Sequence, residues 1–190
     1  MKNGILAASC FMALAISSGA SGDSLLDDAY FAVDGATSPG NSLWGGRMEF
    51  GVQPNQGWGA ALNVAFASGF FTCGCAHYSS TYLGGQPLGL RGVSTYGLFA
   101  TYTYAANDWL HLTANTGVAH TDYEVSVLTA NSGYVLQSSA TNIGAGLSMQ
   151  AVLSDEFELR LQYESMHIPG NITGINRINY LSAGGIFRFR

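Results

Sequence analysis

Hydrophobic and polar positions alternate one by one along most of this chain. In the stretch WGAALNVAFASGF, residues 58–70, the side chains of Trp58, Leu62 and Phe66 would share one face of a strand. Asn63 and small residues would occupy the opposite face. A period of two indicates β-strand, because successive strand side chains point to opposite faces. Several runs exceed ten residues, whereas strands of globular proteins usually have about 5–6. The pattern predicts an all-β chain with long strands.

The connections between these alternating segments are short and long in turn. Residues 54–57, 105–108 and 154–156 are tight turns by their composition, while the stretches 71–90 and 124–136 are long. If the strands run up and down, every tight turn falls at one end and every long loop at the other, as in outer-membrane barrels. The eight predicted strands are 28–36, 43–53, 58–70, 91–104, 109–123, 137–153, 156–166 and 177–189.

Composition narrows the class of protein. Of the 190 residues, 47% are hydrophobic and 10% are charged, against about 25% charged in a typical soluble domain. This composition excludes a disordered chain, which needs high charge and few aromatic residues. Lys2 is the only lysine, and the formal net charge is −5. Because the chain is acidic and has no cluster of basic residues, nucleic acid is excluded as the expected partner.

The first residues are typical of an export signal. A positive charge precedes an apolar stretch, residues 5–16, which is too short to cross a bilayer. Small residues follow, so cleavage is expected after Ala20 or Gly22. We therefore predict a signal peptide over residues 1–22 and a single barrel domain over residues 23–190. The alternative is an N-terminal membrane anchor.

Aromatic residues decide between a secreted all-β protein and an outer-membrane barrel. Beyond the signal, no apolar run approaches the ~18 residues of a transmembrane helix. Aromatic side chains next to the tight turns would lie at one height and form a girdle at the membrane interface. In a soluble barrel they would only cap strand ends, and a lipocalin-type barrel would be apolar inside. The residues in question are Trp58, Tyr104, Trp109, Phe157 and Phe189.

The last segment, SAGGIFRFR, has the pattern of a closing strand. It resembles the C-terminal assembly signal of outer-membrane barrels, in which a polar residue, a glycine two positions later and two alternate aromatic residues recur. Ser182, Gly184, Phe187 and Phe189 occupy those places, and Arg190 departs from the pattern, because the family usually ends on the aromatic residue. The last strand is therefore expected to pair with the first, which leaves no open edge in the membrane.

With this motif, the chain resembles the small outer-membrane barrels of the OmpA, OmpX and opacity-protein type. The resemblance implies an all-β fold, an eight-stranded antiparallel up-and-down transmembrane β-barrel in the bacterial outer membrane. It also implies contacts with outer-membrane lipids and lipopolysaccharide, and with the barrel-assembly machinery during biogenesis. No cofactor is expected.

Charged residues on the polar face of two strands predict a filled lumen. Glu158, Arg160 and Glu164 lie opposite the apolar face of strand 156–166, and Arg47 and Glu49 share the polar face of strand 43–53. The interior of an eight-stranded barrel is about filled by its own side chains. Charges there must pair, because an isolated buried charge is costly. We predict a structural network and a plugged polar interior rather than a pair of catalytic carboxylates.

The long stretch 71–90 carries three residues with metal-binding chemistry. Cys73, Cys75 and His77 would share one face of an extended segment, which is a possible soft-metal site. A fourth ligand is missing, and thiols of an exported loop are open to oxidation. A disulfide or inert thiols are favoured, and no metal site is predicted.

One histidine raises an enzymatic alternative. Some eight-stranded barrels are lipid A deacylases, in which a His-x-Ser-Asn stretch precedes the last strand, and His167 lies in a similar place. Pro169 stands at the serine position and cannot act as a nucleophile. Ser165 lies on the wrong side of the histidine. The sequence therefore favours a non-enzymatic barrel.

We expect the surface-exposed loops to carry the function, which would be envelope integrity or adhesion. The segment YEVSVLTANSGYVLQS, residues 123–138, alternates around ANSG and predicts a hairpin that protrudes above the membrane. The edge of such a hairpin can add a strand to an external partner. A narrow pore for small solutes is the remaining alternative.

Overall fold

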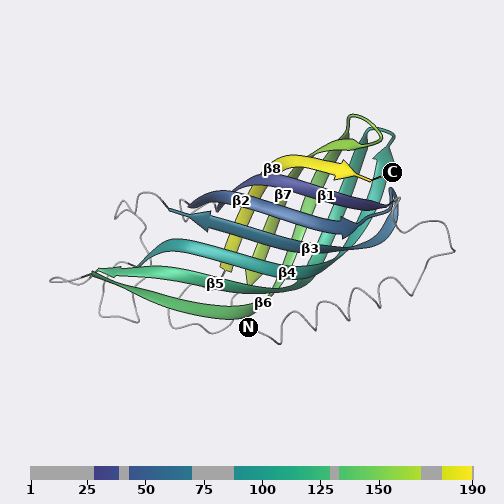
Figure 1. Cartoon of the computed structure of the whole chain (residues 1–190). Coiled ribbons are helices and arrows are strands. Elements are labelled where there is room, and N and C mark those ends of the chain that lie inside the picture. Colours follow the sequence, from purple (N-terminus) through teal and green to yellow (C-terminus); the bar gives the residue numbers. More distant parts are fainter. Residues whose placement is uncertain (1–27, 39–42, 70–87, 129–132, 168–176, 190) are drawn as a thin grey trace.

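The chain folds into a closed barrel of eight antiparallel strands (Figure 1). The computed structural model describes residues 28–38, 43–69, 88–128, 133–167 and 177–189. Each strand pairs with its neighbours in sequence, and β1 also pairs with β8, so the predicted all-β up-and-down barrel is confirmed. The strands are β1 (Ala29–Ser38), β2 (Leu43–Val52), β3 (Gly57–Ser68), β4 (Leu88–Asn107), β5 (Leu110–Leu128), β6 (Gly133–Val152), β7 (Phe157–His167) and β8 (Arg177–Arg188).

Three strands are longer than the alternation indicated. The predicted connection 124–136 is strand on both sides of residues 129–132, with Leu128 paired to Gly133, so the predicted hairpin is confirmed. β4 begins at Leu88, inside the stretch predicted as a loop, because its first residues pair with the far part of β5. In Figure 1 the ends of β4, β5 and β6 extend together beyond the other strands.

Several sequence predictions lie outside the described residues. They concern the signal peptide over residues 1–22 with its cleavage site, and the candidate site at Cys73, Cys75 and His77. Within the described ranges, no helix is long and apolar enough to cross a bilayer.

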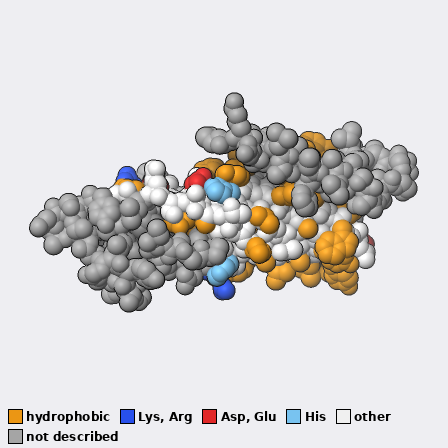
Figure 2. All heavy atoms as spheres, turned by 90° about the horizontal axis from the view of Figure 1, so that it is seen from below, with side chains coloured by type: hydrophobic (Ala, Val, Ile, Leu, Met, Phe, Trp, Pro, Cys, Tyr) orange, Lys and Arg blue, Asp and Glu red, His pale blue; other side chains and the backbone are white. Residues whose placement is uncertain are grey.

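Alternation places hydrophobic side chains on the outer wall and most polar ones inside. Asn63, Thr95 and Gln150 are buried, whereas Leu147 is 68% exposed. Figure 2 shows hydrophobic side chains gathered along the wall on the face that it presents. A soluble barrel would have the opposite arrangement, because exposed apolar area in water is unfavourable. Further exposed members of this wall are Val33, Met48, Val64, Val118, Ile143, Met149, Leu159 and Leu161.

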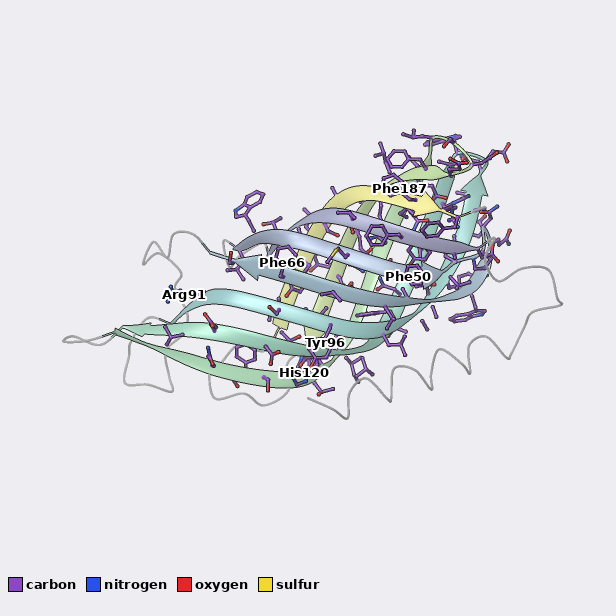
Figure 3. All side chains as sticks on the ribbon, in the orientation of Figure 1. Phe50, Phe66, Arg91, Tyr96, His120 and Phe187 are labelled. Atoms are coloured by element: carbon purple, nitrogen blue, oxygen red, sulfur yellow. The ribbon has the colours of Figure 1, made fainter. Side chains whose placement is uncertain are left out.

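Aromatic side chains gather at the tight-turn end of the wall. The rings of Trp58 and Tyr102 are 5.1 Å apart between centroids, and those of Phe157 and Phe187 are 5.0 Å apart. The predicted girdle residues Trp58, Tyr104, Trp109 and Phe189 are exposed, while Phe157 is half-buried against Phe187. In Figure 3, Phe50 and Phe187 lie toward the tight-turn end, and Phe66 lies toward the other.

The lumen also contains an apolar layer near the long-loop end. Phe99 is fully buried there, and a side chain at Gly144 would come within 3.1 Å of its ring. Glycine on β6, two strands away from β4, therefore makes room for a large ring inside a narrow barrel. The apolar layer consists of Leu43, Ala67, Val93, Phe99, Ala119, Tyr123, Met166, Ile178 and Tyr180.

Candidate functional site

A cluster of five charged residues, here called the central cluster, lies across the middle of the lumen. Arg160 on β7 contacts carboxylates on two strands at once. Its Nη1 donates to Glu49 Oε1 at 2.5 Å, and its Nε and Nη2 both donate to Asp34, the former at 3.4 Å. The planar guanidinium suits this forked arrangement, in which one side chain joins β1, β2 and β7.

Arg47 completes the central cluster. It pairs with Glu49 on its own strand, and its Nη1 lies 3.1 Å from Oε2 of Glu164 on β7. The hydroxyl of Tyr30 donates to Glu49 Oε1 at 2.7 Å, so that carboxylate is held from three sides. All of these side chains are buried. Their pairing offsets the large cost of removing charges from water.

A second group, here called the mouth cluster, lies nearer the tight turns. Arg188 Nε donates to Glu158 Oε1 at 2.5 Å, and Arg188 Nη1 donates to the backbone carbonyl of Gln53 at 2.7 Å. Gln53 Nε2 in turn donates to Gln150 Oε1 at 2.9 Å. His111 is buried beside the pair of Arg188 and Glu158, with its Nδ1 3.8 Å from Glu158 Oε1.

The structure thus divides the five lumen residues predicted from the sequence. Arg47, Glu49, Arg160 and Glu164 come together in the central cluster, and Glu158 belongs to the mouth cluster instead. The sequence reasoning did not name four ionisable participants, although strict alternation puts all of them on inward positions of their strands. These four are Tyr30, Asp34, His111 and Arg188.

The second candidate site is the open edge of β6. β7 pairs with β6 only from Ile143 onward, so residues 133–142 pair with β5 on one side. Within the described part of the chain, no strand pairs with the other side of that segment. The β5–β6 ladder is reinforced by side chains, because Gln137 Nε2 donates to Glu124 Oε1 at 3.0 Å and Tyr123 donates to Ser138 at 3.1 Å.

The outer face at the base of this hairpin is polar and aromatic. The rings of Tyr96 and His120 are 5.2 Å apart, and His120 Nε2 lies 3.5 Å from Asp122 Oδ1. Figure 3 places Tyr96 and His120 where β4 and β5 leave the barrel, with Arg91 farther along β4. At this level, β4 and β5 therefore carry polar and aromatic side chains on their outer face.

Comparisons with known proteins bear on the fold. No protein-family model matches the sequence, and no curated protein matches it. A major outer membrane protein from Thermus thermophilus is similar in structure, with 15% identity, a TM-score of 0.58, and 85% of this chain and 99% of that chain covered. Neisserial surface protein A has 16% identity and a TM-score of 0.55, with 85% and 94% covered.

Ail, the attachment invasion locus protein of Yersinia pestis, has 15% identity and a TM-score of 0.53, with 85% of this chain and 96% of that chain covered. The fold is that of the small outer-membrane β-barrels. At these identities the likeness establishes the fold alone, and it confirms the resemblance to the OmpA and OmpX type that the sequence predicted.

In this outer-membrane-type barrel, the four residues of the expected assembly signal lie on or beside the β1–β8 seam. Phe187 and Phe189 are half exposed on the outer wall, and Ser182 is buried. Gly184 faces Asp34 across the seam. A Cβ at Gly184 would lie 2.0 Å from the carbonyl oxygen of Val33 and 2.5 Å from Cα of Asp34. The glycine therefore makes room for β1, where Asp34 binds Arg160.

Of the residues considered for enzymatic or metal chemistry, the structure describes Ser165 and His167. His167 is the last residue of β7, is exposed and pairs with Arg177 in the ladder. Pro169 lies outside the described residues. Within the described ranges, no three histidine, cysteine, aspartate or glutamate side chains are placed to hold a metal ion.

Proposed function

We propose that this chain is a non-enzymatic outer-membrane barrel whose β5–β6 hairpin contacts other surfaces, in adhesion or in maintaining the envelope. The apolar wall supports the location, because exposed side chains such as Leu147 and Ile143 need hydrocarbon rather than water around them. Lipids and lipopolysaccharide would surround this wall, and the assembly machinery would insert it. The similar structures are themselves named as outer membrane or surface proteins.

The lumen contents favour a plug over a narrow pore. Arg160 and Arg47 bind carboxylates from three strands, and the apolar layer around Phe99 lies between them and the long-loop end. Ions would have to break several buried pairs to pass, at a cost of several kcal/mol. The carboxylates of the central cluster are each held by a guanidinium, which also argues against acid–base catalysis there.

The open edge of β6 carries the proposal for surface contact. A strand edge presents unpaired N–H and C=O groups, and an extended segment of a partner can add to it by backbone hydrogen bonds. Residues 133–142 form such an edge beyond the end of β7. One similar structure is named as an attachment invasion locus protein, which agrees with a role in attachment.

Shortening the hairpin tests this proposal. Removing residues 125–136 and joining Glu124 to Gln137, which face each other in the ladder, through Asn-Gly keeps the barrel and removes the outer part of the edge, residues 133–136. Bacteria displaying the full chain should adhere to epithelial monolayers severalfold more than bacteria with an empty vector, and the shortened chain should lose that gain. Both chains should remain in the outer membrane and show heat-modifiable migration in gels.

Two matched measurements sharpen the result. The pair of changes Gln137→Lys and Ser139→Lys keeps the hairpin length but places charges beside the edge, and should also reduce adherence. Adherence that survives both the shortening and the charges would refute a role for this edge. Separately, release of fatty acid from lipopolysaccharide by the purified barrel, lost on His167→Ala, would refute the non-enzymatic part.

A further inference from the structure

The tight-turn end of the barrel opens into a pocket of about 380 Å³, here called the mouth pocket. Three turns form its rim: Asn55 follows β2, Asp108 follows β4 and Asp155 follows β6. Its floor is formed by His111 of β5 and Glu158 of β7, which belong to the mouth cluster. The pocket lies far from the open edge of β6, at the opposite end of the strands. The proposed function makes no use of it.

Two buried polar atoms at the floor have no hydrogen-bond partner. His111 is 6% exposed, and its Nδ1 is unpartnered, since Glu158 Oε1 at 3.8 Å is too far for a hydrogen bond. Glu158 is 1% exposed, and its Oε2 is also unpartnered, while its Oε1 accepts from Arg188. Buried polar atoms nearly always have partners, so these two point to a ligand group that would occupy the pocket.

The charges of the residues around the pocket determine whether the ligand is a cation or an anion. Asp108, Asp155 and Glu158 line it, and none of its lining residues is lysine or arginine. The guanidinium of Arg188 does not line the pocket. Its Nε donates to Glu158 and its Nη1 to the carbonyl of Gln53, while its Nη2 has no hydrogen-bond partner. A pocket with several carboxylates and a buried floor attracts cations and concentrates them.

We propose that the mouth pocket binds a small organic cation with a primary ammonium group at each end, of the size of a short alkyl diamine. An ammonium group has three N–H donors and turns freely, so one end would donate to Glu158 Oε2 and to His111 Nδ1. The second ammonium group would meet the carboxylates of the rim, Asp108 and Asp155. The volume is at the lower end of the ~300–1,000 Å³ typical of small-molecule sites.

Titration of 1,4-diaminobutane into the folded, full-length barrel in a zwitterionic detergent tests the proposal. At low ionic strength we expect saturable binding by calorimetry. Asp108→Asn removes one rim charge from an exposed turn and should weaken binding by about three- to five-fold, as for an exposed ion pair. His111→Phe keeps a ring at the floor without its nitrogens and should weaken binding by about tenfold.

The matched control is Asp122→Asn, which removes the same charge near the base of the hairpin at the other end of the barrel. It should leave the affinity unchanged, and uncharged 1,4-butanediol should not bind. Loss of affinity equal in Asp122→Asn and Asp108→Asn would overturn the proposal, because it would show attraction to net charge alone. Absence of saturable binding, equal binding of butanediol, or Ca²⁺ occupying the pocket without competition from the diamine would overturn it as well.

Discussion

At the scale of single residues, Arg160 determines how the lumen is held together. Its guanidinium contacts Asp34 and Glu49, which come from two other strands, and all three side chains are buried. Removing one partner from such a group leaves the remaining charges in a dry environment without compensation. The stability of the barrel should therefore depend more on Arg160 than on any exposed arginine.

Replacing Arg160 with Met tests this dependence. Met keeps much of the side-chain length but leaves Asp34 and Glu49 facing each other, so the free energy of unfolding should fall by about 3–5 kcal/mol. Urea unfolding of the barrel in lipid vesicles measures it. Arg91→Met changes an exposed side chain and should cost no more than about 0.5 kcal/mol. Equal stability of the two variants would contradict the role assigned to Arg160.

Alternation identifies which residues face the lumen, but it does not give their height along the barrel. Arg160 and Glu158 are two residues apart on the same strand, yet they belong to different clusters. The height of each pair depends on how far neighbouring strands are staggered, a property of the whole barrel. For the same reason the sequence could not pair Asp34 with Arg160, which lie 126 positions apart.

At the scale of elements, closure depends on how near β1 and β8 approach each other. The ladder between them runs from Tyr30 opposite Arg188 to Thr37 opposite Leu181. A Cβ at Gly184 would meet backbone atoms of β1, which cannot rotate away as a side chain can. The requirement for glycine in this place is therefore steric, in addition to any recognition by the assembly machinery.

Gly184→Ala should destabilise the seam, with a loss of about 1–3 kcal/mol as in other overpacked sites. The matched control is Gly35→Ala on the same seam, where the nearest atom would be 3.9 Å from the new Cβ. That change should be neutral or slightly stabilising, since alanine restricts the unfolded chain more than glycine does. The fraction of heat-modifiable barrel after refolding gives the comparison. Equal yields from both variants would show that β1 moves aside without cost.

Strand boundaries were predictable where a turn marks the end of the alternation. β2 and β7 begin and end within one residue of the predicted bounds. β4, β5 and β6 extend farther because they pair with one another beyond the barrel, and pairing maintains a strand outside the membrane as well as inside it. The alternation alone does not show where the membrane ends.

At the scale of the whole molecule, the outer wall and the expected assembly signal overlap at Phe189. Its backbone N–H donates to the carbonyl of Ala29 at 2.9 Å, and its ring lies 6.5 Å from that of Phe50. Phe189→Ser should lower the amount of folded barrel in the outer membrane severalfold and slow its insertion. We expect this because the last aromatic residue is proposed to guide assembly.

The control for Phe189→Ser must remove an exposed aromatic side chain from the outer wall at a position away from the last strand. Phe66 is exposed to a similar degree on the outer wall toward the other end of the barrel. Phe66→Ser loses about the same favourable burial in lipid, on the order of 1.5–3 kcal/mol, without touching the last strand. Similar defects in the two variants, measured by pulse-chase insertion, would show that only apolar area matters.

The fold was predictable at this scale, because long alternating strands with polar inner faces have few alternatives to a membrane barrel. The chemistry of an external partner was not predictable, since the strand edge proposed to bind it offers backbone groups that any sequence has. The mouth pocket also escaped prediction. It forms only when His111 and Glu158 are brought beside three turns that are far apart in the chain.

The seam between β1 and β8 has a kinetic consequence. Its contacts join residues near the two ends of the described chain, as in the pair of Tyr30 and Arg188, so closure is the most non-local step of folding. Such contacts form slowly, because a long stretch of chain must lose conformational entropy before the contacts contribute favourable free energy. Until then both seam strands expose unpaired edges, and a nascent barrel can associate with its copies edge to edge. Pairing of β8 with β1 is therefore the step at which productive folding competes with aggregation, and it must be rapid.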